Sequence, residues 1–367
     1  MSALFETFTL KSVTLRNRIV VSPMCQYSSI DGIANEWHYS HYASLARGGA
    51  GLVVVEATAV SPEGRITPGC AGLWNDQQAQ ALVPIVQSIK AAGAVAGIQI
   101  GHAGRKASAQ RPWEGDDHIA ENDPQGWETL SASAIALGGG LPKTPKAMTL
   151  SDIERVKADF VSATIRARDA GFEWLELHFA HGYLAMGFLS AHSNQRTDQY
   201  GGSVENRSRF IIETLAAVRE VWPQALPLTV RLGVIEYDGR DEETLLQSLA
   251  LAKTLKTLGI DLLDVSMGFS TATPEVPWGT PAFLAPVAQR FRRETGLPVT
   301  ASWGIDTPEL AEQAITQGQL DLVSLGRALL SNPHWPYHAA RKLGVDNASW
   351  TLPAPYAHWL ERYAVVA

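Results

Sequence analysis

The sequence contains little cysteine: only Cys25 and Cys70 occur among its 367 residues. Two thiols cannot form a disulfide framework, and these two do not have the spacing of a zinc finger. They also leave no cysteine-rich segment of the kind that holds an iron–sulfur cluster. We therefore expect a reducing, cytoplasmic setting.

Long apolar runs and blocks of basic residues are missing as well. No apolar run approaches the roughly 20 residues that cross a bilayer, and the N-terminus has no basic region before an apolar core. The formal net charge of -7 argues against general nucleic-acid binding. We expect neither a membrane nor a nucleic acid as a partner. With 46% hydrophobic and 18% charged residues, the composition is that of a globular chain.

Eight short runs rich in Val, Ile and Leu alternate with longer segments of helical pattern. Such runs are typical of parallel strands buried on both faces, and parallel strands need crossover connections. One strand–helix unit repeated eight times predicts an α/β fold, the (β/α)8 or TIM barrel, with an open doubly wound sheet as the alternative. The runs are Ile19–Ser22, Gly51–Glu56, Ala96–Ile100, Trp174–His178, Leu228–Arg231, Leu262–Ser266, Pro298–Ala301 and Leu320–Leu325.

Three segments lie outside this repeat. Residues Phe5–Leu15 alternate apolar and polar side chains, which predicts an N-terminal hairpin that closes the bottom of the barrel. The long excursion after the third strand, about residues 102–148, is rich in Gly, Pro, Asp and Trp and predicts a functional inserted loop or lid. The aromatic C-terminal tail, about residues 345–367, predicts an interface element. We interpret residues 1–367 as a single domain.

Capping residues mark the starts of two helices. Ser151-Asp-Ile-Glu154 has the pattern of a capping box at the start of the helix that follows the long excursion. Asp306-Thr307-Pro308 places a capping side chain just before a proline in the first turn of a later helix. Both patterns support helices between the predicted strands.

Polar and reactive side chains collect at the ends of the predicted strands. In (β/α)8 enzymes the active site lies at the carboxyl ends of the strands. We therefore expect a functional rim. Its residues are Ser22, Pro23, Met24, Cys25, Glu56, Ala57, Gln99, His102, His178, His181, Arg231, Ser266, Ser302, Trp303, Gly326 and Arg327.

The ends of the last two strands have the features of a phosphate site. Ala301-Ser-Trp-Gly304 and Ser324-Leu-Gly-Arg327 place glycines where backbone N–H groups can approach an anion. Arg327 adds a charge-assisted contact, and the loops after strands seven and eight are the usual phosphate site of this fold. The alternative is that both glycines only turn the chain.

Gln99 and Arg231 are expected to point into the mouth of the barrel. A buried arginine needs a partner. A flat, electron-accepting ring would satisfy both side chains, since its carbonyl groups accept hydrogen bonds and the positive charge stabilises the reduced ring. The alternative is an ion pair between Arg231 and Glu56 or Glu176.

His178, His181 and Tyr183 lie within six residues of one another at the end of the fourth predicted strand. Imidazoles can donate hydrogen bonds to a substrate oxygen, and a phenol can deliver a proton. Three alternatives stay open at this point: a metal site, although a third ligand in suitable spacing is missing; two buried structural histidines; and a Cys25 nucleophile with one histidine as its base.

Several motifs, in this order along the chain, resemble those of the Old Yellow Enzyme family of flavin-dependent ene-reductases. The resemblance covers nearly the whole chain. The pair His178 and His181, with Cys25 and Tyr27, resembles the thermophilic-like subclass. The motifs are Arg16-Asn-Arg-Ile19, Ser22-Pro-Met24, His102-Ala-Gly-Arg105, His178-Phe-Ala-His-Gly-Tyr183, Ser193-Asn-Gln-Arg-Thr-Asp-Gln-Tyr-Gly-Gly-Ser203 and Glu205-Asn-Arg207.

This resemblance implies non-covalent FMN as the cofactor and NADPH, or else NADH, as the reductant. It implies a small electrophilic alkene, such as an α,β-unsaturated carbonyl compound, as the substrate, and a homodimer or homotetramer as the assembly. The residues that would hold FMN are Ser22, Pro23, Met24, Cys25, Ala57, Gln99, Arg231, Trp303, Gly304, Gly326 and Arg327.

The resemblance also implies roles on the substrate side. His178 and His181 would bind the substrate oxygen, Tyr183 would donate the proton, and Cys25 would tune the flavin rather than act as a nucleophile. Tyr27 would bind the oxygen or shape the pocket. Trp303 and Trp359 would complete the pocket, and either Trp359 or Arg362 would reach this site or that of a neighbouring subunit. No metal is implied, and other flavin-barrel reductases, or a flavin-free phosphate-binding barrel, are the alternatives.

Overall fold

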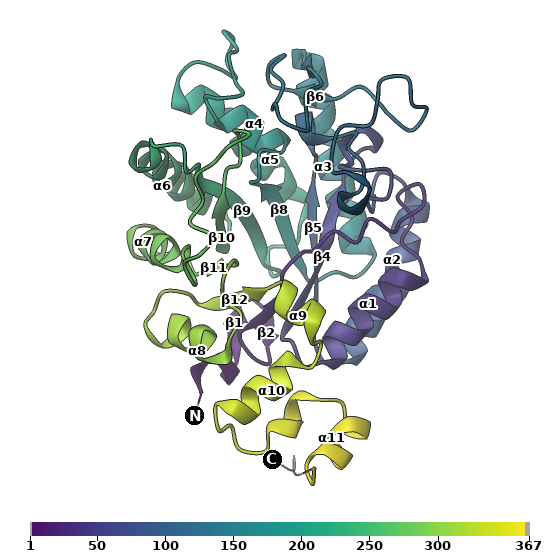
Figure 1. Cartoon of the computed structure of the whole chain (residues 1–367), viewed down its shortest axis with the longest axis vertical. Helices are drawn as coiled ribbons and strands as arrows, with labels where there is room; N and C mark the ends of the chain where they lie inside the picture. Colours follow the sequence, from purple (N-terminus) through teal and green to yellow (C-terminus); the bar gives the residue numbers. More distant parts are fainter. Residues whose placement is uncertain (1, 364–367) are drawn as a thin grey trace.

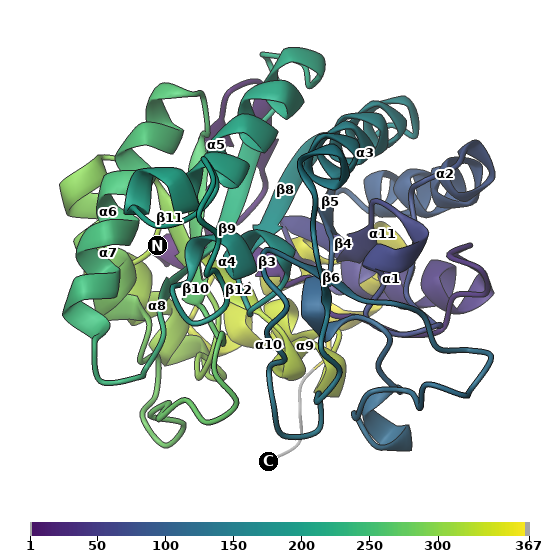
Figure 2. The same cartoon turned by 90° about the horizontal axis from the view of Figure 1, so that it is seen from above.

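Eight parallel strands close into a barrel, which confirms the predicted (β/α)8 architecture. The computed structural model describes residues 2–363. Helices surround the strands, as the view from above shows (Figure 2). In chain order, the barrel strands are β3 (Ile19–Val21), β4 (Leu52–Ala59), β5 (Val95–Gly101), β8 (Trp174–Phe179), β9 (Leu228–Ile235), β10 (Leu262–Met267), β11 (Val299–Ala301) and β12 (Leu322–Leu325).

Most of the helices connect these strands and pack on the outside of the barrel, whereas the last three follow the final strand (Figure 1). The main apolar core lies between the two layers, because the strands present apolar side chains outward to the apolar faces of the helices. The helices are α1 (Glu36–Arg47), α2 (Asp76–Ala91), α3 (Leu150–Asp169), α4 (Leu184–Leu189), α5 (Val204–Val221), α6 (Asp241–Thr257), α7 (Ala285–Thr295), α8 (Pro308–Thr316), α9 (Arg327–Ser331), α10 (Trp335–Lys342) and α11 (Ala354–Leu360).

One helix start differs from its prediction by two residues. Thr149, not Ser151, caps α3, and its side chain accepts a hydrogen bond from the Asp152 N–H group. Asp152 completes the capping box in the place predicted for Glu154. The predicted start of α8 is confirmed, because Thr307 caps it immediately before Pro308.

The predicted N-terminal hairpin is present as β1 (Phe8–Leu10) and β2 (Val13–Leu15). Its buried residues Val13 and Leu15 form a second, smaller core with apolar side chains from the barrel strands. Several of those partners, such as Trp174 and Leu262, are the first residues of their strands, so the hairpin closes the end of the barrel opposite the strand ends.

The long excursion and the C-terminal tail have the expected positions. Residues 102–148 run between β5 and α3, and their only ladder joins the two-residue strands β6 (Leu130–Ser131) and β7 (Lys146–Ala147). In the tail, α11 packs on η5 (Ala348–Thr351), below the barrel in Figure 1. The part of the predicted tail at residues 364–367 lies outside the described residues. Within residues 2–363, no helix is long and apolar enough to cross a membrane.

The half-buried guanidinium of Arg16 joins the hairpin to two helix ends. It donates hydrogen bonds to the carbonyl groups of Ala46, Ala50 and Ala92 at 2.9 to 3.1 Å. Ala46 lies in the last turn of α1, and Ala92 caps the C-terminus of α2. One side chain therefore supplies donors to the carbonyl groups of Ala46 and Ala92 at two helix C-termini, where carbonyl groups lack intrahelical partners, and to that of Ala50; Ala46 also accepts from the Gly49 N–H group at 3.2 Å.

We predict that Arg16→Met lowers the free energy of unfolding by about 2 to 4 kcal/mol, because several buried carbonyl groups lose their donors together. Urea denaturation would measure the change. The matched control is Arg47→Met, since the exposed Arg47 donates to a single carbonyl group and its loss should cost less than about 1 kcal/mol. Equal effects of the two substitutions would contradict this role of Arg16.

Candidate active site

A layer of four polar side chains crosses the inside of the barrel. Gln99 on β5 is in register with Glu176 on β8, and its Nε2 donates a hydrogen bond to Glu176 Oε1 at 2.8 Å. Arg231 on β9 is in register with Asp264 on β10, and Arg231 Nε lies 3.2 Å from Asp264 Oδ2. The predicted alternative ion pair of Arg231 with Glu56 or Glu176 is therefore wrong, because the strand register brings Asp264 to it instead.

Burial raises the pKa of both carboxyl groups in this layer. The pKa of Glu176 is raised by burial and by the nearby Asp264, and Arg231 opposes both effects. The pKa of Asp264 is also raised by burial, again against the attraction of Arg231. Arg231 also donates from Nη2 to Ser302 Oγ at 2.7 Å. One guanidinium thus faces two buried carboxyl groups, which favours a proton on one of them.

His178, His181 and Tyr183 meet where β8 ends. The ring centroid of His178 lies 4.8 Å from that of His181 and 5.0 Å from that of Tyr183. His181 has a left-handed backbone, with φ of 59°, and its N–H group donates to the Met267 carbonyl at the end of β10 at 3.0 Å. This turn, which the hydrogen bond to Met267 holds in place, brings the ring of His181 next to that of His178.

Both imidazoles are held in the neutral form. Burial, Arg231 and Lys106 lower the pKa of His178, and the same groups together with His178 lower the pKa of His181. A neutral imidazole donates through one nitrogen only. His181 Nε2 lies 2.8 Å from Ser266 Oγ, whereas His178 Nδ1 is buried without a hydrogen-bond partner among the described residues.

Two of the three alternatives for these residues, the metal site and the Cys25 nucleophile, are not supported by the structure. Across residues 2–363, no group of three or more His, Cys, Asp or Glu side chains is arranged to hold a metal ion. The pKa of the Cys25 thiol is raised by burial, with Cys70 and Glu56 adding to the effect. A raised pKa disfavours the thiolate that a nucleophile requires.

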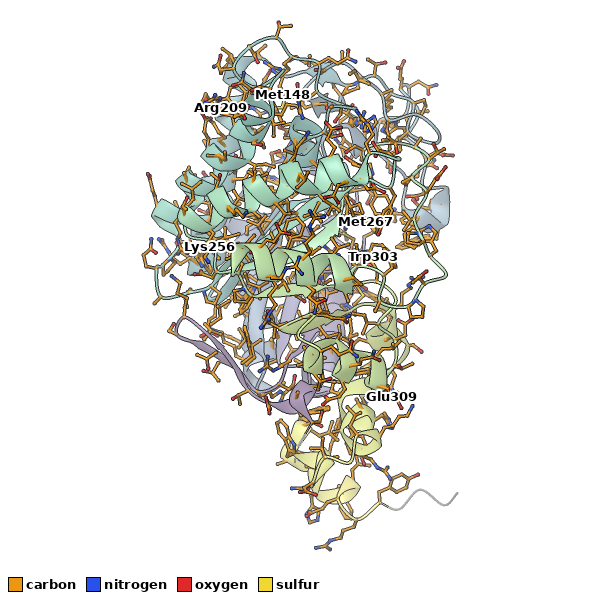
Figure 3. All side chains as sticks on the ribbon, turned by 90° about the vertical axis from the view of Figure 1, so that its left-hand side faces the viewer. Met148, Arg209, Lys256, Met267, Trp303 and Glu309 are labelled. Carbon is orange, nitrogen blue, oxygen red and sulfur yellow. The ribbon has the colours of Figure 1, made fainter. Side chains whose placement is uncertain are left out.

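A cavity of about 290 Å³ lies beside these groups, at the carboxyl ends of the strands. Figure 3 shows Trp303, in its wall, on the same side of the molecule as Met267. Most residues predicted to bind a cofactor contribute to this wall. The predicted residues that line it are Ser22, Pro23, Met24, His181, Arg231, Trp303, Gly304, Gly326 and Arg327.

The other predicted residues lie around this cavity rather than in its wall. Ala57 and Tyr183 line a small void of about 10 Å³ together with His102. Cys25 and Tyr27 are electrostatically coupled to Tyr183: burial raises the pKa of Tyr183, and Cys25 adds to the effect. Burial likewise raises the pKa of Tyr27, with Cys25 and Tyr183 adding.

Trp359 is the predicted pocket residue that does not lie near this cavity. It is 76% exposed on α11, which packs on η5. Its predicted role therefore concerns the site of a neighbouring subunit and stays a prediction, as does that of Arg362.

The sequence analysis missed three residues at the mouth. Lys106 Nζ lies 5.9 Å from the ring centroid of Tyr183 and 5.8 Å from that of Phe269. Burial and the nearby Arg105 lower the pKa of Lys106 to about 8. Phe269 stacks on Trp278 at 6.2 Å. The motif His102-Ala-Gly-Arg105 ends one residue before Lys106 and could have pointed to it, whereas nothing local marks Phe269 or Trp278.

Comparison with known proteins identifies the family. The family model described as "NADH:flavin oxidoreductase / NADH oxidase family" matches residues 3–346. The chain belongs to this family. Its resemblance to the Old Yellow Enzymes is confirmed: a solved structure of morphinone reductase in complex with tetrahydroNAD matches with a TM-score of 0.77 and 28% identity, over 94% of this chain and 91% of that chain.

Two further relatives of this flavin oxidoreductase are informative. The NADPH dehydrogenase of Geobacillus thermodenitrificans (strain NG80-2) is 42% identical over 346 residues, which is 94% of this chain and 95% of the relative. A complex of 2-naphthoyl-CoA reductase matches with a TM-score of 0.84 at 23% identity, a likeness that shows the fold alone. That match covers 93% of this chain and 52% of the chain of 2-naphthoyl-CoA reductase.

The cavity fits the FMN that this family uses, which overturns the flavin-free alternative. The buried Arg231 Nε has no aligned hydrogen-bond partner among the described residues, and Trp303 Nε1 is also unpartnered there. Arg327, which also lines the cavity, is exposed and forms no ion pair within residues 2–363. Unpartnered donors and a free cation beside Gly304 and Gly326 suit a polar ring that carries a phosphate.

We predict that Glu176→Gln becomes more stable relative to the wild type as the pH rises from about 4 to 8. The unfolded chain releases the glutamate proton near pH 4.3, about its ordinary pKa, whereas the folded protein retains it to higher pH because its pKa is raised. Folding of the wild type therefore becomes less favourable through this window by up to about 1.4 kcal/mol per pH unit.

Urea denaturation at several pH values, with FMN at one saturating concentration, would measure this trend. Glu361→Gln, at an exposed position, is the matched control and should give a stability difference that does not depend on pH in this way. A constant difference between Glu176→Gln and the wild type would show that Glu176 ionises in its ordinary range.

Proposed function

We propose that this flavin oxidoreductase is an NADPH-dependent ene-reductase for α,β-unsaturated carbonyl compounds and related electrophilic alkenes. The observation that carries the proposal is the close group formed by two neutral imidazoles and one protonated phenol. The ring centroids of His181 and Tyr183 lie 4.8 Å and 5.0 Å from that of His178. Two neutral donors suit an oxygen that gains negative charge during the reaction. A phenol beside them suits the delivery of a proton.

The cofactor would lie in the 290 Å³ cavity. Gly304, Gly326 and Arg327 would hold the phosphate, and Ser22, Pro23 and Met24 would line one side of the ring. Arg231 and Gln99 would bind the polar edge of the ring, with Cys25, Ala57 and Trp303 beside it. When bound and reduced by NADPH, FMN supplies the hydride that the alkene receives at its β-carbon.

His178 and His181 would bind and polarise the substrate oxygen. Because burial, Arg231 and Lys106 lower the pKa of each ring, the imidazoles stay neutral and donate an N–H without releasing a proton. Tyr183 would hold the proton for the α-carbon. Its raised pKa keeps the phenol protonated at neutral pH, so the proton is present when the substrate binds.

The remaining site residues would shape the pocket. Cys25 and Tyr27 would face the substrate from the segment after β3, and Trp303 from the end of β11. Trp359 would enter the site of a neighbouring subunit in a homodimer or homotetramer. Residues 1–367 would act as one domain, with 102–148 as a lid and 345–367 as the interface tail.

A titration with FMN and an enone tests the proposal. Purified protein should bind FMN, absorb near 450 nm, lose this absorbance with NADPH under anaerobic conditions and regain it with an enone such as 2-cyclohexenone. The saturated ketone should be the product. Reoxidation by oxygen but not by any of a panel of enones, nitroalkenes and quinones would refute ene reduction while leaving a flavin oxidoreductase.

We predict that Tyr183→Phe slows reoxidation by an enone about a hundredfold to ten-thousandfold, because general acid catalysis of this kind contributes about 10²–10⁴-fold. Reduction by NADPH should change little, since that half-reaction needs no proton at an α-carbon. Stopped-flow absorbance of the two half-reactions would measure both rates. Tyr237→Phe, at a half-buried tyrosine beside Phe283, is the control. Equal losses in both half-reactions would contradict the proton-donor role.

A further inference from the structure

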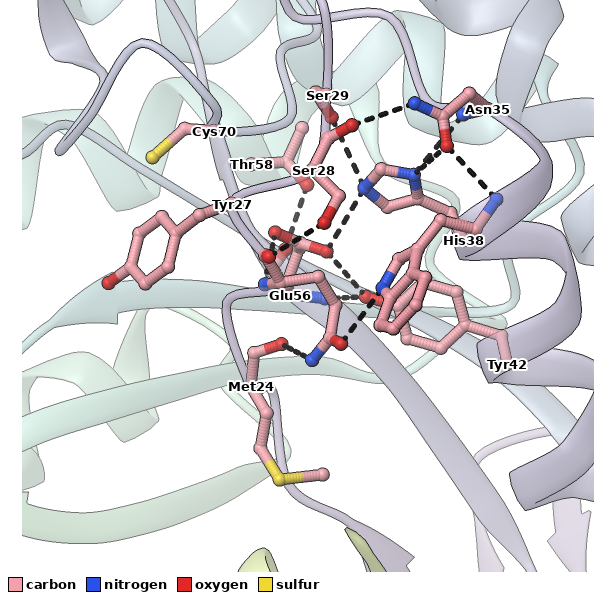
Figure 4. A network of polar contacts seen from close by, with 12 residues as sticks. Met24, Tyr27, Ser28, Ser29, Asn35, His38, Tyr42, Glu56, Thr58 and Cys70 are labelled. Atoms are coloured by element: carbon pink, nitrogen blue, oxygen red, sulfur yellow. Dashed lines mark hydrogen bonds and ion pairs between the residues drawn. The ribbon is translucent and has the colours of Figure 1, made fainter. Parts of the chain in front are cut away.

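A buried carboxyl group lies behind the segment that carries Cys25 and Tyr27. Glu56, in β4, is fully buried and has no lysine or arginine within ion-pair distance among the described residues. Its Oε2 accepts a hydrogen bond from the Gln26 N–H group at 2.9 Å, and its Oε1 accepts one from the Tyr42 hydroxyl at 3.0 Å. Figure 4 shows this network, with Tyr27 and Tyr42 extending to opposite sides of Glu56.

The segment that Glu56 contacts has a backbone that needs support. Tyr27 has a positive φ of 50°, a conformation that a bulky residue adopts only when its surroundings hold it there. The N–H group of the preceding Gln26 is bound by Glu56, and the Tyr27 carbonyl accepts from Arg111 Nε at 2.9 Å. Tyr27 is therefore tethered on both sides, once from inside the protein and once from its surface.

Helix α1 gives Glu56 no charged partner. The Asn35 N–H group donates to His38 Nδ1 at 3.2 Å, Asn35 Oδ1 lies equally close to Nδ1, and the other ring nitrogen, Nε2, faces Glu56. That nitrogen lies 3.2 Å from Ser29 Oγ and 3.5 Å from Glu56 Oε1. Burial and His41 lower the pKa of His38 to about 4, so the ring is neutral when Glu56 ionises.

The charge state of Glu56 changes near neutral pH. Burial raises its pKa to about 7, although the hydrogen bonds from Gln26 and Tyr42 oppose the shift. The carboxylate accepts from Gln26 more strongly than the neutral acid, because charge-assisted hydrogen bonds are about twice as strong as neutral ones. The titratable groups that face Glu56 are His38 and Tyr42 from α1, Cys25 and Tyr27 from the segment after β3, and Cys70 from the segment after β4.

We propose that Glu56 is a positioning residue: its carboxylate fixes the Gln26 N–H group and thereby holds Cys25 and Tyr27 at the substrate side of the flavin. Loss of this bond releases the segment 22–29 from its strained conformation. As the pH falls through 7, the bond weakens and the segment loosens. The inference rests on the proposed function in naming Cys25 and Tyr27 as substrate-side residues, but the hydrogen bond acts whether or not an alkene is the substrate.

Hydrogen–deuterium exchange of the FMN-loaded enzyme tests this inference without turnover. In Glu56→Gln, exchange of the peptide covering residues 22–29 should be up to about tenfold faster than in the wild type, because a neutral amide oxygen replaces the charge-assisted acceptor of the Gln26 N–H group. Tyr42→Phe is the matched control when exchange is compared at a pH well above the pKa of Glu56, where the carboxylate stays charged: it removes the other partner of Glu56 but leaves the bond to Gln26, so this peptide should change by less than about threefold.

Alkylation of Cys25 by iodoacetamide, followed by mass spectrometry, gives a second readout. Burial raises the pKa of Cys25, and the charges of Cys70 and Glu56 add to the effect, so Cys25 in Glu56→Gln should react faster at a given pH. Glu56→Asp separates charge from position, since it keeps the charge but is one methylene too short to reach Gln26. If Glu56 positions the segment, exchange in Glu56→Asp resembles that in Glu56→Gln.

The inference would be overturned if the peptide covering residues 22–29 exchanged at the wild-type rate in both Glu56→Gln and Glu56→Asp. It would also be overturned if Tyr42→Phe accelerated exchange of this peptide as much as Glu56→Gln does. If the variants do not fold, the pH dependence of exchange in the wild-type protein still tests the inference. After correction for intrinsic exchange, residues 22–29 should be less protected at about pH 6 than at about pH 8, and equal protection would overturn the inference. Failure of the enone test with these exchange results intact would refute the proposed function alone.

Discussion

The buried guanidinium of Arg231 sets the protonation of the groups around it. The register of β8, β9 and β10 places it beside Asp264 and opposite His178. Its charge opposes the rise in pKa that burial imposes on Glu176 and Asp264, and it lowers the pKa of His178. A single cation therefore favours a charged carboxyl group on one side and a neutral imidazole on the other. Closure of the barrel fixes this arrangement, because no one strand contains it.

A second buried carboxyl group supports the opposite side of the mouth in a different way. Asp264 has a guanidinium within 3.2 Å, whereas Glu56 relies on N–H and O–H donors. Arg231 opposes the rise in pKa that burial imposes on Asp264, whereas no cation does so for Glu56. Carboxyl groups on both sides of the mouth therefore have raised pKa values, but only those on the β8–β10 side have a guanidinium beside them. The two sides flank the place where substrate would bind.

Much of the fold and part of the site could be predicted from the sequence. The eight strands were predictable because each is a short, continuous apolar run, and the motif from His178 to Tyr183 marks the site by its residue types. The pairing of Arg231 with Asp264 was not predictable, because it depends on the register between two strands 33 positions apart. Phe269 and Trp278 come from a loop whose path no local pattern gives, whereas Lys106 directly follows the motif His102–Arg105, which could have pointed to it. The cap of α3 was misplaced because Thr149 and Ser151 both have capping side chains, and only the backbone decides between them.

Three aromatic rings at the mouth of the barrel are carried by residues with a strained, left-handed backbone. His181, Phe269 and Trp303 have positive φ values of 59°, 49° and 81°, and their ring centroids lie 5.7 to 6.3 Å apart. Each left-handed residue costs about 1 to 3 kcal/mol, so the turns persist only where other contacts hold them. The bond from the His181 N–H group to Met267 is one such contact, and Ala282 N–H binds the Gly304 carbonyl next to Trp303 at 3.0 Å. Glycine would relieve the strain at each position but would remove the ring, so the mouth keeps its aromatic wall at the expense of stability.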